Sequence, residues 1–218
     1  MGTGPAGAGA RFGEIVGGQP PRSPANGEDE RLLSGDMGEL AETYRRRADA
    51  FMTLIERTPP DRWSSASPCA GWLARDVVAH VVDYSAQVLR EKAGMAEAPV
   101  FADFDEPAAA FRATREVLDG VLNDPATPRK VASHLHWSLS FDLPQHGWDL
   151  AMATGQDPTM DPDELELLWG SLNGAKDNWD WQRASGWYGP PVPVAEEAVL
   201  QDRVLGLLGR DPSWNSPT

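Results

Sequence analysis

The chain has 218 residues, and 33 acidic side chains against 19 basic ones give it a formal net charge of −14 at pH 7. This acidity argues against a nucleic acid or an anionic membrane surface as partner, because both require a basic face. The only cysteine is Cys69, which excludes an intrachain disulfide and a zinc finger, and no apolar run approaches the roughly 20 residues of a membrane helix.

Residues 1–36 are rich in Gly, Pro, Ala and charged side chains and show little hydrophobic periodicity, so we expect a disordered leader. They lack the basic start and apolar stretch of a secretory signal. Met37 opens the first well-patterned segment, and two explanations stay open: the natural start lies at Met37, or the leader is a functional tail. We expect residues 37–218 to form the folded domain of a cytoplasmic protein.

Apolar residues recur at helical spacing through most of the remaining chain. Helices are expected over 37–57, over 72–92, from Glu106 and Pro107 onward, over part of 131–154, from Asp161 and Pro162 onward, and within 198–209. A Trp- and Gly-rich connection (178–189) and an extended segment, GPPVPV, precede the last helix. No strongly alternating run is present, which predicts an all-α protein: a four-helix bundle with an additional C-terminal helix and an extended proline-rich segment.

Three side chains on two of these helices form a candidate metal site. His80 lies on an apolar stripe, where a lone histidine is more often a core or pocket residue than a ligand. Asp142 and His146 change this interpretation, because residues four apart lie about 40° apart around a helix and can reach one point. The nitrogen and oxygen donors suit Zn²⁺, Ni²⁺ or Fe²⁺. Three protein ligands also leave positions for water or substrate, as in catalytic sites.

Pro144 makes this hypothesis conditional. If Ser140 caps the helix, Pro144 lies in its first turns, where a missing N–H matters least, and Asp142 and His146 share a face. If the helix instead begins at Pro144, Asp142 lies outside it and the ligand set fails.

Three ordered motifs carry a resemblance to a known family. SPCAGWLARDVVAHVVDY and DLPQHGWDLAMATG resemble the Pro-Cys-x-Gly-Trp and Asp-x-x-x-His-Gly-Trp-Asp segments of actinobacterial proteins in the DinB/YfiT-like superfamily. YGPPVPV and the tail DRVLGLLGRDP are similar to the C-terminal stretches of the same proteins. This group includes the mycothiol-dependent maleylpyruvate isomerases and many metal-binding relatives, and the similarity covers about residues 37–214. It implies a DinB-like bundle.

The resemblance also implies a metal triad on His80, Asp142 and His146, and it favours a helical Asp142. Its open site would bind the thiolate of mycothiol or a similar small thiol, since a divalent cation lowers the thiol pKa. The thiolate would then add to an electrophilic carbon of a small metabolite. The isomerases have glutamate where this chain has Asp142, which leaves the metal open, with Zn²⁺ expected before Ni²⁺ or Fe²⁺.

Other residues near the triad have two interpretations each. Asp149 either orients a liganding histidine or pairs with an arginine such as Arg75. His134 and His136 fit a helix start or pocket rim better than a metal site. Cys69 is expected to be structural, because the chain has no second cysteine to resolve an oxidised one.

Aromatic residues could wall a pocket for a flat apolar substrate. The candidates are Trp148, Trp179, Trp181 and His136. The alternative for the tryptophans is ordinary core or loop packing.

We therefore expect a metal-dependent thiol transferase or isomerase with a small-molecule substrate. Two alternatives stay open: a thiol-independent enzyme of natural-product biosynthesis, and a non-catalytic protein that binds a metal or a small molecule. The sequence is compatible with a monomer or a homodimer.

Overall fold

The computed structural model describes residues 36–174, 179–184 and 188–215 of the chain, apart from the side chains of Trp181 and Gln182. Nearly all of the expected leader therefore lies outside the described residues. Within them the fold is all-α, as predicted, and the one pairing of β type is an isolated bridge between Ala66 and Leu73. None of the described helices is long and apolar enough to cross a membrane.

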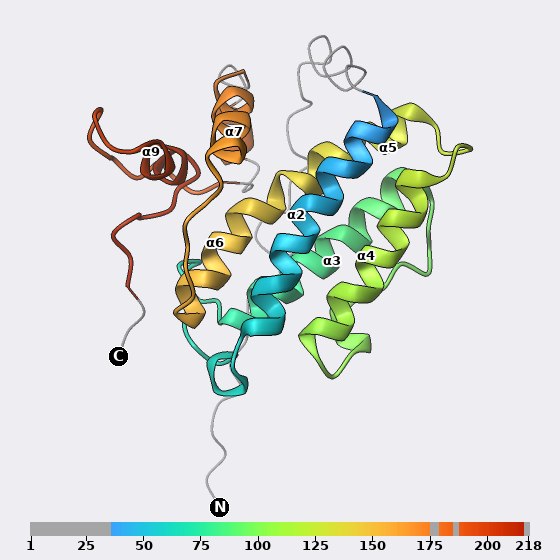
Figure 1. Cartoon of the computed structure of the whole chain (residues 1–218), viewed down its shortest axis with the longest axis horizontal. Coiled ribbons are helices and arrows are strands. Elements are labelled where there is room, and N and C mark those ends of the chain that lie inside the picture. The colour runs from blue at the N-terminus through green and yellow to red at the C-terminus, as the bar shows by residue number, and fades with distance from the viewer. Residues whose placement is uncertain (1–35, 175–178, 185–187, 216–218) are drawn as a thin grey trace, which may run out of the picture.

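Helices α2 (Met37–Arg57), α3 (Ala74–Ala93), α4 (Pro107–Asn123) and α6 (Asp142–Thr154) form the bundle, and α5 (Arg129–Leu135) leads into α6 (Figure 1). Two short 3₁₀ turns, Pro60–Arg62 and Phe101–Asp103, lie in the loops. Helix α2 packs mainly on α4 and α6, and α3 packs on the same two helices. The bundle therefore buries one contiguous apolar core.

Helix α2 has the bounds that the sequence predicts. The carboxylate of Asp36 accepts a hydrogen bond from the backbone N–H of Gly38 at 2.8 Å, which satisfies a donor in the first turn. One face carries the buried stripe that includes Tyr44, Phe51 and Ile55. The ring of Phe51 meets Phe111 of α4 edge-on, with centroids 5.0 Å apart. The spacing of the apolar residues therefore accounts both for the bounds of α2 and for the face that packs on α4.

Helix α3 begins two residues later than expected. The backbone N–H of Leu73 donates to the Asp76 carboxylate at 2.9 Å, and Trp72 stays in the preceding loop. The helix ends at Gly94, whose φ of 70° is the left-handed conformation that glycine adopts readily. His80 therefore lies near the middle of a rigid helix.

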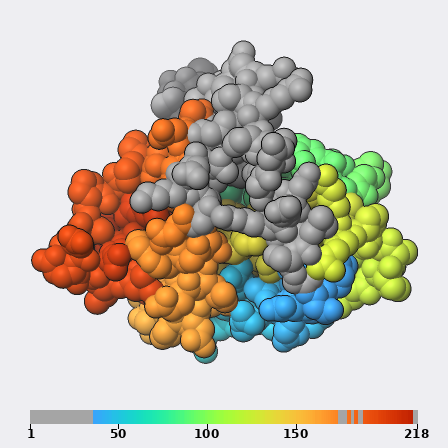
Figure 2. Space-filling model, turned by 90° about the horizontal axis from the view of Figure 1, so that it is seen from above, coloured from blue at the N-terminus to red at the C-terminus, as the bar shows by residue number. Residues whose placement is uncertain are grey.

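The C-terminal elements build a second, smaller apolar cluster. Helices α7 (Pro162–Gly174) and α9 (Leu200–Leu207) pack together, with α8 (Trp179–Ala184) between them in sequence. Figure 2 shows these orange and red elements on one side of the bundle. The predicted Trp- and Gly-rich connection over 178–189 contains a short helix, α8, that the sequence pattern did not indicate. Its Trp179 is buried and contacts Tyr188 with ring centroids 5.3 Å apart, so packing stabilises a helix too short for periodicity to reveal.

Candidate metal centre

His80, Asp142 and His146 converge from two helices. His146 Nε2 lies 3.3 Å from Asp142 Oδ1, and His80 Nε2 lies 3.7 Å from Asp142 Oδ2. The three donor atoms fall within 4.8 Å of one another. Donors about 2.0 Å from a tetrahedral Zn²⁺ are separated by about 3.3 Å. The observed spacing is therefore compatible with one shared cation.

The backbone before Asp142 resolves the question that Pro144 raises. Residues His136–Ser140 form a π-helical turn, and Phe141 keeps right-handed helical angles, so α5 runs into α6 without a break. Pro144 has no N–H to donate to the Ser140 carbonyl, and the wider π turn lies directly before this missing bond. The expectation that Ser140 caps the helix is wrong, since its hydroxyl contacts His136 Nδ1 at 3.3 Å. Asp142 is nevertheless helical and shares a face with His146.

The Asp142 carboxylate has one satisfied and one unsatisfied oxygen. Its Oδ1 accepts a hydrogen bond from Gln145 Nε2 at 2.7 Å. Its Oδ2 is buried and has no hydrogen-bond partner among the described residues. A buried carboxylate oxygen without a partner is costly, and a cation between it and the two imidazoles would satisfy it. The donor set thus fits a divalent metal that prefers nitrogen and oxygen ligands.

The electrostatics of the three groups set the charge of the site in the absence of a metal. Burial lowers the pKa of His80 to about 4, which keeps its imidazole neutral and able to coordinate. Burial also acts on His146, but the carboxylates of Asp142 and Asp149 outweigh it and hold the His146 pKa well above its usual range. Against its own burial, the imidazoles and Gln145 lower the pKa of Asp142 to about 2. Without a metal, the protonated His146 imidazole therefore compensates the Asp142 carboxylate, and a bound cation would take the place of this proton.

A buried network lies behind His146. Its Nδ1 is 2.9 Å from Asp149 Oδ2, and Arg210 Nη2 donates to the same oxygen at 2.9 Å. The thiol of Cys69 donates to Asp149 Oδ2 at 3.2 Å. Asp149 therefore both orients a histidine and pairs with an arginine. The arginine is Arg210 and not Arg75, which the sequence suggested. The guanidinium of Arg75 lies instead over the Phe101 ring, 5.7 Å from its centroid.

Two aromatic side chains flank the histidines. The ring of Tyr84 stacks on His80 at a centroid distance of 5.8 Å. Trp72 contacts both imidazoles, with centroid distances of 4.9 Å to His80 and 6.1 Å to His146. These contacts restrict the rotation of the rings that would bind the metal.

Comparison with known proteins adds the family to this geometry. The mycothiol maleylpyruvate isomerase N-terminal domain matches residues 44–137. Two proteins of Mycobacterium tuberculosis, uncharacterized protein Rv0738 of strain H37Rv and uncharacterized protein MT0763 of strain CDC 1551, are each 31% identical to the chain over 185 residues. The alignment covers 77% of this chain and 95% of each relative. The chain belongs to the mycothiol maleylpyruvate isomerase N-terminal domain family. No solved structure matches it.

The segment matched by this isomerase-domain family contains Cys69 and His80 but ends before Asp142 and His146. The triad is therefore a property of the folded chain, in which α6 brings its acid and histidine to α3. Arg210 was not selected from the sequence as a site residue. The only signal for it was its place in the tail motif DRVLGLLGRDP.

The other candidates whose side chains are described make their contacts outside the triad. Trp148 is buried on another face of α6 and lines a cavity beside α2. Trp179 packs in the second apolar cluster. His136 is buried with its Nδ1 3.2 Å from the Leu40 carbonyl oxygen, and His134 contacts the Lys130 carbonyl. The backbone of Trp181 lies in α8, but its side chain is outside the described part of the chain.

Proposed function

We propose that the chain is a metal-dependent enzyme that acts on a small electrophilic metabolite. Its reaction is a transfer or an isomerisation that depends on mycothiol or a similar small thiol. The observation that carries this proposal is the convergence of His80, Asp142 and His146 in a member of this family. Three protein ligands leave coordination positions for a substrate atom. When bound, a divalent metal would lower the pKa of a thiol and so supply a thiolate nucleophile at neutral pH.

The chain's own residues prepare this site. Arg210 and Cys69 hold the Asp149 carboxylate, which in turn fixes the orientation of His146. Trp72 and Tyr84 pack against His80 and shield it from water. Asp142 contributes a buried negative charge that offsets part of the charge of the cation. Each of these contacts holds the proposed ligands in position before the metal binds.

Metal analysis of purified protein tests the triad. Wild-type protein should retain about one equivalent of a divalent metal, whereas His80→Ala and His146→Ala should lose most of it. His134→Ala is the matched control, because this histidine lies outside the triad and contacts the Lys130 carbonyl of its own helix. Equal metal content in all four proteins would show that the triad does not bind the metal.

The thiol is tested separately, with the metal-loaded wild type and a panel of small electrophiles. Turnover that requires mycothiol supports the proposed reaction. Turnover without any thiol would replace it with direct metal catalysis. Metal binding without turnover across the panel would favour a binding protein.

A further inference from the structure

A second concave site lies on the side of α6 that faces away from the metal ligands. A cavity of about 560 Å³ lies between α2, α6 and the segment from Asp157 to Glu164, which enters α7. Its apolar walls include Phe51, Leu54, Leu143, Pro144, Gly147 and Ala151. Both the volume and these walls are typical of sites for small organic molecules.

The helical period separates this cavity from the metal centre. At about 100° per residue, Gly147 and Ala151 lie roughly opposite Asp142 and His146 around α6. None of the three proposed metal ligands lines the cavity. A ligand in the cavity would therefore contact the back of α6, and its binding does not depend on the proposed function.

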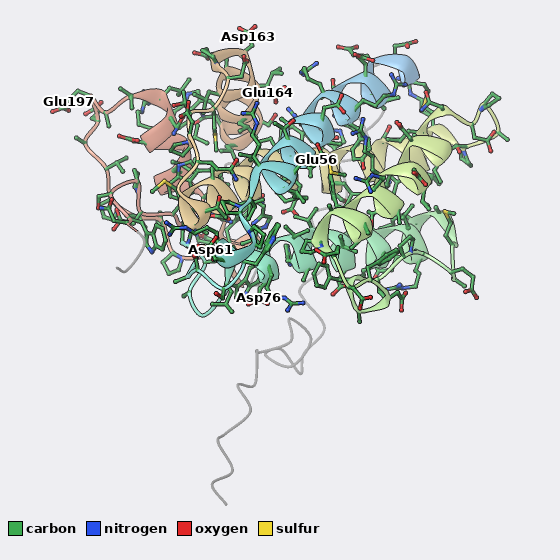
Figure 3. The ribbon with its side chains drawn as sticks, turned by 60° about the horizontal axis from the view of Figure 1, so that its bottom comes forward. Glu56, Asp61, Asp76, Asp163, Glu164 and Glu197 are labelled. Carbon is green, nitrogen blue, oxygen red and sulfur yellow. The ribbon has the colours of Figure 1, made fainter. Side chains whose placement is uncertain are left out.

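The two arginines of the cavity wall share one carboxylate, that of Glu164. Arg47 Nε donates to Glu164 Oε2 at 2.6 Å, and the Arg47 side chain is only 3% exposed. Arg46 donates to Glu164 Oε1 from Nε at 3.1 Å and from Nη2 at 2.6 Å. Glu164 lies on the side of α7 that faces α2, whereas Asp163 lies at the outer end of that helix (Figure 3). The positive charge of the cavity is therefore either buried or already paired.

The rim of the cavity is negative. Asp157, Asp161 and Asp163 are exposed and form no ion pair within the part of the chain that the structure describes. Asp157 accepts a hydrogen bond from the backbone N–H of Thr159, and Asp161 accepts two from the start of α7. The helix dipole offsets part of the charge of Asp161, but these N–H donors carry no full charge. With Glu164, the lining holds four carboxylates against two guanidinium groups, which leaves a net charge of −2.

We propose that this cavity binds an amphipathic organic monocation of the alkylammonium type. Its apolar body packs against the walls of α2 and α6, which accounts for most of the affinity. Its ammonium group lies at the rim and donates charge-assisted hydrogen bonds to the aspartates. An anion with the same apolar body meets an excess of carboxylates and binds more weakly.

Isothermal titration calorimetry at low ionic strength tests the proposal with octylammonium and octanoate, which differ in the charge of the head group. Both are used below their micelle concentrations. Octylammonium should bind the full chain at one site with a dissociation constant below about 1 mM. Octanoate should bind at least about tenfold more weakly. Added salt should reduce this difference, because the aspartates of the rim are exposed.

Charge-only variants locate the ammonium group. Asparagine can still accept the backbone hydrogen bonds at positions 157 and 161, so it removes charge and preserves the local turns. The triple variant Asp157→Asn, Asp161→Asn, Asp163→Asn should therefore weaken octylammonium binding at least about tenfold and should not weaken octanoate binding. The matched control removes three exposed acids that do not line the cavity: Asp61→Asn, Glu97→Gln and Asp103→Asn. This control should bind octylammonium nearly as tightly as the wild type.

Two further positions locate the apolar body. Ala50 lies at the exposed edge of the cavity, so Ala50→Phe should block entry, while Ala50→Ser should leave binding unchanged. Asp142→Asn should also leave it unchanged, and loss of binding there would overturn the proposal by placing the amine at the metal centre. No binding by the wild type, equal binding of octanoate, or full binding by Ala50→Phe would overturn it as well. Equal loss in the two triple variants would do the same, because it would show general attraction to an acidic chain.

Discussion

The carboxylate of Asp149 and the guanidinium of Arg210, 61 residues apart in the chain, form a buried ion pair directly behind the candidate metal ligand His146. Asp149 is completely buried, and Arg210 contacts it through Nη2 at 2.9 Å and Nε at 3.4 Å. Glu164 makes a further ionic link between the C-terminal elements and the bundle, on the cavity side of α6. The C-terminal tail therefore completes the support of a site whose ligands all lie in the bundle.

Replacing Arg210 should weaken metal binding although it contributes no ligand. In Arg210→Met, Asp149 loses its strongest partner and no longer fixes the orientation of His146. Loss of such a supporting contact typically costs about 10- to 100-fold in metal affinity. Competition with a chromophoric chelator would measure this change in folded protein. Arg62→Met should keep wild-type affinity, and an unchanged affinity in Arg210→Met would show that the tail is dispensable.

Metal should stabilise the wild type and fail to stabilise Asp142→Asn. A ligand that binds only the folded state adds about 2.7 kcal/mol at a concentration 100 times its Kd. For a chain of this size, that gain raises Tm by several degrees. Asp142→Asn removes the charge that the cation would neutralise, so its Tm should not respond to Zn²⁺. Asp61→Asn, at an exposed position (Figure 3), should respond like the wild type. A full response in Asp142→Asn would contradict the assignment of this ligand.

The sequence predicts the helices and the three candidate metal ligands for different reasons. The bundle helices bury regular apolar stripes, which is why α2 ends where its periodicity ends. Asp142 and His146 were visible as a pair because they lie four residues apart on one helix. His80 alone, on an apolar stripe, did not identify its partners; the acid–histidine pair made it a candidate ligand, and the resemblance then implied a triad on the same three residues.

The missed features depend on contacts that local patterns do not record. The π turn before Asp142 accompanies a proline four residues after Ser140, which leaves the Ser140 carbonyl without its helical donor. Arg210 reaches Asp149 only when the tail folds back over the bundle. The cavity beside α2 arises where small residues of α6, such as Gly147 and Ala151, face the α2 surface. Each of these features is tertiary, and spacing along the chain cannot predict it.

Gly206 should be intolerant of a side chain, because the proline-rich segment crosses directly over it. A Cβ at this position would lie 2.7 Å from the Val192 carbonyl oxygen and 3.0 Å from Val194 Cγ1. Gly206→Ala should therefore reduce the free energy of unfolding by about 1–3 kcal/mol, the usual cost of overpacking. Gly120→Ala in α4 is the matched change, since nothing lies within 4 Å of its Cβ position.

That control should instead gain roughly 0.5–1 kcal/mol, because alanine loses less backbone freedom in a helix. Urea unfolding of the two variants would measure both values. Equal effects at the two positions would show that the proline-rich segment does not pack on α9 as described.

His136 should make stability depend on pH. Burial lowers its pKa from 6.5 to about 4, and the nearby charge of Arg47 adds to this effect. Between these values the unfolded chain binds a proton that the folded chain does not. The contribution of His136 is therefore fully present above pH 6.5 and is lost as the pH falls toward 4.

Urea unfolding of metal-free protein near pH 7 and near pH 4.5 tests this prediction, with His136→Asn as the comparison. Asparagine can still donate to the Leu40 carbonyl, which His136 contacts at 3.2 Å, but it does not titrate. The wild type should lose on the order of 2 kcal/mol more than His136→Asn between the two conditions. Other carboxylates and histidines titrate in both proteins and cancel in this difference. The same loss in both proteins would mean that His136 binds its proton equally well in the folded and unfolded chain.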